Sequence, residues 1–84
     1  MIRLLFDEND IGHTIKSIRK SKGISQEVLS GLAGIARTHL TMIENGTKQA
    51  NFITICKIAG AFEMKPSELV RRIEEFSEKR EKAN

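Results

Sequence analysis

Apolar residues recur along most of this chain at intervals of three and four positions, the spacing that gives a helix one apolar face. Three segments keep this spacing over about two turns, and their apolar sets are Ile11, Ile15 and Ile18; Ile55, Ile58, Ala59 and Phe62; and Leu69, Ile73 and Phe76. Two shorter segments hold Val28, Leu29 and Leu32, and then Leu40 and Ile43. Alternation of apolar and polar residues over four or more positions, the mark of a half-buried strand, is not seen. The pattern predicts an all-α fold of five helices with short connections.

Capping and turn residues predict where these helices begin and end. Asn9 or Asp10 is suited to cap the first helix, and Gly23 is suited to end it. The other boundary signals are the N-caps Ser25 and Asn51, the stops Gly34 and Asn45-Gly46, a third helix over about Ala36 to Glu44, and Pro66 in the first turn of the fifth helix. The segment Arg3–Phe6 fits either a short strand or the start of an extra helix, and the charged residues 77–84 are expected to fray.

The composition is typical of one small folded domain over residues 1–84. Hydrophobic residues make up 39% of the positions and charged residues 30%, which excludes a disordered chain. One cysteine excludes a disulfide within the chain, no apolar run reaches the length of a membrane span, and no secretory signal is evident. These features favour the cytoplasm.

The side chains that enzymes combine for catalysis are not combined in this sequence. The chain has two histidines and one cysteine, but no orienting third group is visible for His39 and Cys56. We therefore expect no catalysis, no metal site and no cofactor. We interpret His13 as a surface residue of the first helix and Cys56 as a small, partly buried apolar residue of the fourth.

The net charge of +3 is unevenly distributed along the chain. Residues 1–10 sum to −2, residues 11–62 sum to +5, and residues 63–84 sum to zero because six acidic and six basic side chains cancel. A localised positive field is expected of a surface that binds a polyanion such as nucleic acid. Charge alone leaves open whether the basic segment is such a surface or a solvated face.

The basic segment contains two short helical patterns joined by a glycine turn, over 25–45, which is the arrangement of a helix-turn-helix. Gly34 suits the left-handed conformation of the turn, while Leu40 and Ile43 anchor the second helix to the core. This packing leaves four side chains of the second helix on the outer side of the domain: Arg37, Thr38, Thr41 and Met42. A helix held in this way can enter the major groove of DNA with its N-terminal residues against base edges.

Two stretches, IGHTIKSIRKSKGISQEVLSGLAGIARTHLTMIENG and NFITICKIAGAFEMKPSEL, keep a familiar spacing. Its elements are Ile18-Arg19, Ser25-Gln26-Glu27, Ile43-Glu44-Asn45-Gly46 and Lys57-Ile58-Ala59. Over residues 11–69 the chain therefore resembles the Cro/C1-type helix-turn-helix family, which includes phage repressors, xenobiotic-response-element-type regulators and many small bacterial transcription factors. The resemblance implies a lambda-repressor-like domain with a recognition helix over about 36–45, and residues 70–84 as the end of the fifth helix and a charged tail.

The resemblance also implies roles for single residues. Gln26 matches a glutamine that binds a phosphate and braces the recognition helix, and Arg37 and Thr38 match the base-contacting positions. The further DNA contacts that it implies are His39, Thr41 and Met42 on the same helix, and Lys48 and Gln49 in the loop after it. Arg19 and Glu44 match a largely buried ion pair between the first and third helices, so we interpret Glu44 as structural.

The chemistry of these side chains suits such roles. Arg37 can donate two hydrogen bonds to guanine O6 and N7, which contributes about 1–3 kcal/mol of discrimination. Met42 can only make apolar contact, where the family often has a polar reader, so base readout depends more on Arg37 and Thr38. Ala36 stands where the family often has a Ser or Thr cap, so the third helix lacks the stabilisation of about 1 kcal/mol that such a cap provides. Ala50 stands where the family often has proline.

These features predict a sequence-specific transcriptional regulator that binds double-stranded DNA as a homodimer on a palindrome-like operator. The dimer surface that we expect is the fifth helix, through Val70, Ile73 and Phe76, together with the end of the fourth helix; the apolar patch at residues 2–6 is a second candidate. The other interpretation is that these residues complete the core of the monomer.

The kind of regulator is less defined by the residues. A ring at position 39 after Arg37-Thr38 is similar to the Arg-Thr-Tyr of restriction–modification controllers, and a phage-type repressor or an antitoxin-type regulator are alternatives. A protein–protein adaptor with the same fold is the alternative from another class. The resemblance implies a bacterial or phage protein that acts in the cytoplasm at the nucleoid. The operator, activation or repression, and a contact with RNA polymerase are left open.

Overall fold

The computed structural model describes residues 8–83, and the apolar patch at residues 2–6 lies outside the described residues. Over residues 8–83 the chain forms five helices and no strand. The helices are α1 (Glu8–Ser21), α2 (Gln26–Ala33), α3 (Arg37–Asn45), α4 (Phe52–Ala61) and α5 (Pro66–Ala83). The all-α fold of five helices expected from the sequence is therefore confirmed.

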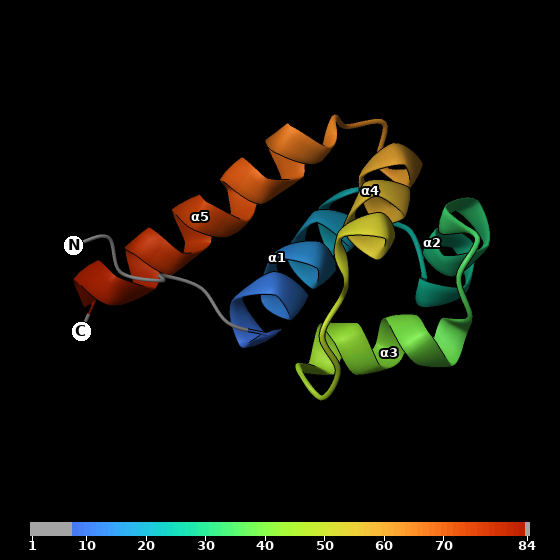
Figure 1. The fold of residues 1–84 in the computed structure, drawn as a ribbon, viewed down its shortest axis with the longest axis horizontal. Helices are drawn as coiled ribbons and strands as arrows, with labels where there is room; N and C mark the ends of the chain where they lie inside the picture. Colours follow the sequence, from blue (N-terminus) through green and yellow to red (C-terminus); the bar gives the residue numbers. More distant parts are fainter. Residues whose placement is uncertain (1–7, 84) are drawn as a thin grey trace.

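The helix α1 lies between α3 and α5 and contacts both of them (Figure 1). The helix α4 packs against α2 and α5, and α2 packs against α3. This arrangement leaves α3 at the edge of the molecule, with one side against α1 and α2 and the other side turned outward (Figure 1).

Local signals in the sequence set most of the helix ends. Ser25 Oγ and Asn51 Oδ1 each accept a hydrogen bond from the backbone N–H three residues later, at 3.1 and 2.8 Å. Gly34 and Gly46 end α2 and α3 with φ of 70° and 77°, a left-handed conformation that glycine adopts at little steric cost. Pro66 is the first residue of α5. These boundaries are the expected ones.

The apolar faces of all five helices meet in one core. Its fully buried large side chains are Ile15, Leu29, Leu40, Ile43, Ile58, Phe62 and Leu69. Ile73 belongs to the same core and is only 2% exposed, so its interpretation as a dimer-surface residue is wrong: its own chain already covers it. By contrast, Val28 and Leu32 are exposed although they share a helix with buried Leu29.

The end of α5 is helical and packed, contrary to the expectation that residues 77–84 fray. Ser77 is fully buried, and its hydroxyl donates a hydrogen bond to the carbonyl of Ile73 at 3.1 Å. One turn further on, Arg80 donates from Nε and Nη2 to both carboxylate oxygens of Asp10, at 2.8 and 2.9 Å. These contacts hold the last turns of α5 against α1, and the described helix continues to Ala83.

The same ion pair corrects the expected cap of the first helix. Asn9 and Asp10 lie inside α1, which begins at Glu8. Asp10 is 1% exposed and is engaged by Arg80, so it connects two helices instead of capping one. Capping residues and buried ion-pair residues are drawn from the same polar types, and the sequence alone did not separate the two roles.

Candidate nucleic-acid interface

The turn between α2 and α3 sets the direction of α3. The backbone N–H of Ile35 donates to the carbonyl of Ser30 at 3.0 Å, which closes the turn around Gly34. Ile35 is half-buried and packs against the core. On α3 itself, Leu40 and Ile43 are 0% and 1% exposed and anchor its inner side. The turn and this anchoring leave the opposite side of α3 exposed.

A buried ion pair joins α3 to α1. Arg19 donates from Nε and Nη2 to Oε2 and Oε1 of Glu44 at 2.8 and 3.0 Å, and from Nη1 to the carbonyl of Ile24 at 2.9 Å. The side chain of Glu44 has no exposed surface, and that of Arg19 is 11% exposed. Hydrogen bonding to Glu44 raises the pKa of Arg19 above its ordinary value, although burial acts in the opposite direction. The pair implied by the resemblance is thus present, and Glu44 faces inward.

Gln26 at the start of α2 extends this pair into a network. Its Nε2 donates to Oε1 of Glu44 at 3.0 Å, and its Oε1 accepts a hydrogen bond from the hydroxyl of Thr41 at 2.9 Å. The Thr41 hydroxyl is also 3.0 Å from the carbonyl oxygen of Arg37 and has one hydrogen to share between the two acceptors. Gln26 and Thr41 therefore brace α2 against α3, and the second N–H of the Gln26 amide is suited to a phosphate oxygen.

The outward side of α3 brings together most of the base-contacting candidates. Arg37 and Thr38 are exposed in its first turn, Met42 is 43% exposed one turn later, and His39 is half-buried beside them. Asn45 is exposed at the end of the same side and was missed as a candidate. Its position seven residues after Thr38 was the signal that could have found it. The face offers a cation, a hydroxyl, an amide and an apolar side chain, the groups that contact base edges in a major groove.

The loop after α3 holds the two candidates for phosphate contacts. Lys48 and Gln49 are both exposed there. Nε2 of Gln49 donates a hydrogen bond to Oε1 of Glu8, at the start of α1, at 2.8 Å. Glu8 stands 41 positions earlier in the chain, and no sequence pattern connected it with this loop. The first turn of α1 therefore lies against the proposed phosphate-contacting loop.

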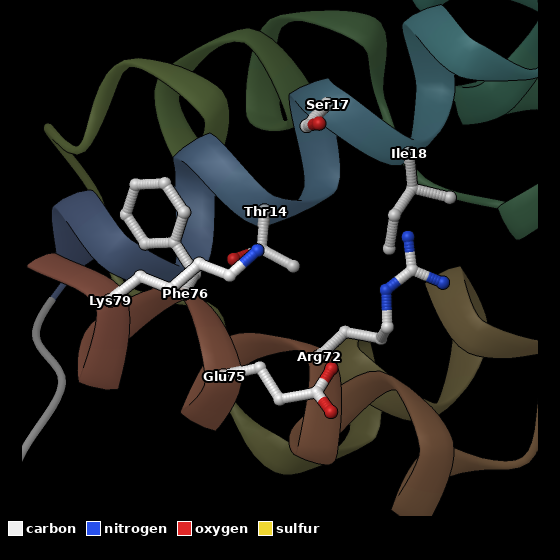
Figure 2. Close-up of a pocket in the computed structure, with 7 residues that line it drawn as sticks. All are labelled: Thr14, Ser17, Ile18, Arg72, Glu75, Phe76 and Lys79. Carbon is white, nitrogen blue, oxygen red and sulfur yellow. The ribbon is translucent and has the colours of Figure 1, made fainter.

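A pocket on the other side of α1 is separate from this face. Figure 2 shows it between α1 and α5. Thr14 of α1 lines it, and the residues of α5 that line it include Arg72, Phe76 and Lys79. The ring of Phe76 stacks on His13 with a centroid distance of 5.6 Å, so Phe76 is partly covered within its own chain. Within the described residues, no group of three metal-ligating side chains gathers, and none of the helices has the length and apolar character to span a membrane.

The fold and this exposed helix define a small helix-turn-helix domain. Residues 15–69 match the helix-turn-helix family HTH_3, and the chain belongs to this Cro/C1-type family of DNA-binding regulators. The sequence is 37% identical over 70 residues to the control protein C.BamHI of Bacillus amyloliquefaciens, a match that covers 82% of this chain and 80% of that protein.

Two solved structures illustrate the likeness. The restriction-modification controller protein C.AhdI from Aeromonas hydrophila has a TM-score of 0.71 and 32% identity, over 74% of this chain and 94% of that chain. The clp gene regulator ClgR from Corynebacterium glutamicum has a TM-score of 0.83 over 96% of this chain and 84% of that chain. ClgR is only 16% identical, so it shows the shared fold alone.

Proposed function

We propose that this chain is a transcriptional regulator that binds specific sequences of double-stranded DNA with α3 in the major groove. The observation that supports this is the contrast between the two sides of α3. Its inner side is held by Leu40, Ile43 and buried Glu44, whereas its outer side presents Arg37 and Thr38 to solvent. A rigid helix at the edge of the molecule, with polar side chains outward, fits a major groove about 12 Å wide. We propose no catalytic activity.

Within this proposal the exposed side chains divide into base readers and phosphate contacts. Arg37 reads a guanine through its two parallel N–H groups, and Thr38 and Met42 offer a methyl or thioether surface to a thymine methyl. Lys48 and Gln49 in the loop after α3, together with the second N–H of Gln26, contact phosphates on either side of the groove and fix the register without reading sequence. His39, half-buried beside Arg37, is a further contact candidate.

We further propose that the regulated system is a restriction–modification system. The support is the relatives: the protein that is 37% identical is a control protein, and the solved structure that is 32% identical is a restriction-modification controller. Both matches extend over most of the relative's own length, at 80% and 94%. A phage-type repressor or an antitoxin-type regulator would bind DNA with the same face and would differ in the operator selected.

We also propose that two copies act together, and we revise the surface that joins them. Phe52 and Ile53 at the start of α4 are 69% and 60% exposed. Phe52 and Val70 line a groove that is mostly apolar, and Lys65 and Glu74 line it as well. Exposed apolar side chains gathered in this way mark an association surface. In such a dimer the two recognition helices would read half-sites about 34 Å apart.

Selection of bound sites from random duplexes tests the DNA-binding proposal. The wild-type protein is expected to select a palindrome-like site, and its affinity is expected to fall steeply with salt concentration. Arg37→Ala is expected to remove the preference at one base position, at a cost of about 1–3 kcal/mol. Lys48→Ala, which removes the same charge, is expected to weaken selected and random duplexes alike.

Three outcomes would contradict these proposals. An equal loss for Arg37→Ala on selected and random duplexes would show that Arg37 is not a base reader. Absence of salt-dependent binding to any duplex would contradict DNA binding and favour a protein–protein adaptor. A species of 9.5 kDa in light scattering at micromolar concentration would contradict the dimer.

A further inference from the structure

We propose that Glu8 competes with DNA for Gln49 and thereby lowers the affinity of this protein for all duplexes. The inference rests on the proposed function, because it assigns Gln49 a contact with the phosphate backbone. Its starting observation is the hydrogen bond from Gln49 Nε2 to Glu8 Oε1 at 2.8 Å, which joins the start of α1 to the loop after α3.

The position of Glu8 is defined by the packing of the turn to which it belongs. Asp10, two residues later, is 1% exposed and receives two hydrogen bonds from Arg80. Gly12 lies so close to the end of α3 that a Cβ there would be 2.8 Å from the carbonyl oxygen of Glu44. This turn is therefore fixed to α5 on one side and to α3 on the other, and it holds the Glu8 carboxylate at the loop.

The chemistry of the contact resembles the one expected with DNA. A carboxylate oxygen and a phosphate oxygen are both anionic acceptors, and either can accept the N–H of the Gln49 amide. While Glu8 accepts a hydrogen bond from one of the two N–H groups of that amide, only the other N–H group is available to a phosphate of DNA. The Glu8 charge also lies within about one Debye length, roughly 10 Å at 0.1 M salt, of any phosphate that reaches Gln49, and it repels that phosphate.

Both effects act on the backbone of the duplex and not on its bases. Phosphate contacts do not read sequence, so Glu8 lowers specific and non-specific affinity by the same factor. Such a residue leaves the choice of operator unchanged and sets the concentration at which the operator is filled. This role also accounts for an acidic side chain beside the loop that holds exposed Lys48.

The direct test is to measure the affinity of Glu8→Gln for the selected duplex and for a random duplex at low salt. Binding is expected to tighten about three- to ten-fold on both duplexes, and the gain is expected to shrink as salt is added. The matched control is Glu63→Gln, which changes the net charge equally. Glu63 is exposed in the connection between α4 and α5. This connection lies across the molecule from α3 (Figure 1), so we expect an effect below two-fold. An equal gain for both variants would overturn the inference.

A double-mutant cycle with Gln49→Ala tests the competition itself. In the wild-type background Gln49→Ala is expected to weaken DNA binding less than two-fold, because Glu8 already engages the amide. In a Glu8→Ala background, which removes both the charge and the hydrogen-bond acceptor, the same change is expected to weaken DNA binding by at least twice that factor. Equal costs in the two backgrounds would overturn the competition between Glu8 and DNA.

Stability measurements separate this role from a purely structural one. Glu8 lies in the first turn of α1, where a negative charge favours the helix, so Glu8→Gln is expected to lower the unfolding temperature slightly. A structural role alone would lower stability and DNA affinity together, whereas competition predicts opposite changes. If the wild-type protein binds no duplex, the proposed function fails as well; if it binds and Glu8→Gln gains nothing over Glu63→Gln, only this inference fails.

Discussion

The helix α1 is joined to its two neighbours by similar ion pairs that differ in their exposure to water. At the junction with α3, the Arg19 side chain is 11% exposed and that of Glu44 is fully buried. At the junction with α5, the Arg80 side chain is 42% exposed and that of Asp10 is 1% exposed. Both carboxylates receive two hydrogen bonds from their arginine. Water can therefore replace part of the hydrogen bonding in the Asp10–Arg80 pair, whereas it has little access to the Arg19–Glu44 pair.

The difference in exposure corresponds to the different roles of the two junctions. The α1–α3 junction carries the outward face proposed to read DNA, and its pair is connected through Gln26 to α2 as well. The α1–α5 junction secures the last turns of α5, whose outer side is solvated. We infer that the position of α3 is more strictly determined than the position of the last turns of α5. The following substitutions test this inference.

The largest effect is expected for Glu44→Ala. The change leaves the Arg19 charge buried without its partner and removes an acceptor from Gln26, which should lower the free energy of unfolding by about 3–5 kcal/mol. Because the fold raises the pKa of Arg19, the part of this stabilisation that depends on the arginine charge is complete at pH 7 and is lost only as the pH rises through the raised pKa.

Urea denaturation followed by circular dichroism measures this change at pH 7. Glu75→Ala removes an exposed glutamate of α5 and is expected to stay within about 0.5 kcal/mol of the wild type. A loss below 1 kcal/mol for Glu44→Ala would break the comparison, because the buried pair would then be as replaceable as a surface one.

A smaller effect is expected for Arg80→Ala at the other junction. Asp10 loses two hydrogen bonds, but removal of the long side chain also lets water reach the carboxylate, so we expect a loss of about 1–3 kcal/mol. Amide hydrogen exchange should accelerate beyond Ser77, where α5 is expected to fray. Arg71→Ala, an exposed arginine on the same helix, is the control and should leave this exchange unchanged. A loss equal to that of Glu44→Ala would reverse the order of the two junctions.

The smallest effect is expected at the start of α3, and its sign is favourable. Ala36 is the N-cap residue, has the extended backbone of a cap (φ −67°, ψ 142°) and offers no side-chain hydrogen bond. With Ala36→Ser, the new hydroxyl oxygen should accept a hydrogen bond from a backbone N–H of the first turn and raise the free energy of unfolding by about 1 kcal/mol. Ala36→Val keeps the extended backbone without that oxygen and should show no gain in thermal unfolding. Equal stabilities for the two variants would show that contacts in the C-terminal half of α3 already stabilise the helix and that an added N-cap contributes nothing.

The sequence by itself determined the number of helices, most of their ends and the helix that faces outward. Ser25, Gly34, Gly46, Asn51 and Pro66 act on the backbone within a few residues, so their effect can be read locally. The spacing of Leu40 and Ile43 likewise determined the inner side of α3, and therefore the exposure of Arg37 and Thr38 on the other side.

The tertiary structure alone decided which residues meet across the fold. The bond of Glu8 with Gln49 and that of Asp10 with Arg80 join positions 41 and 70 residues apart, and neither pair has a local signal. It also decided that Ile73 belongs to the core, because a helical stripe shows which residues share a face but not which of them a neighbouring helix covers. That choice depends on the crossing angles and distances between helices, which are set by the packing of all five at once.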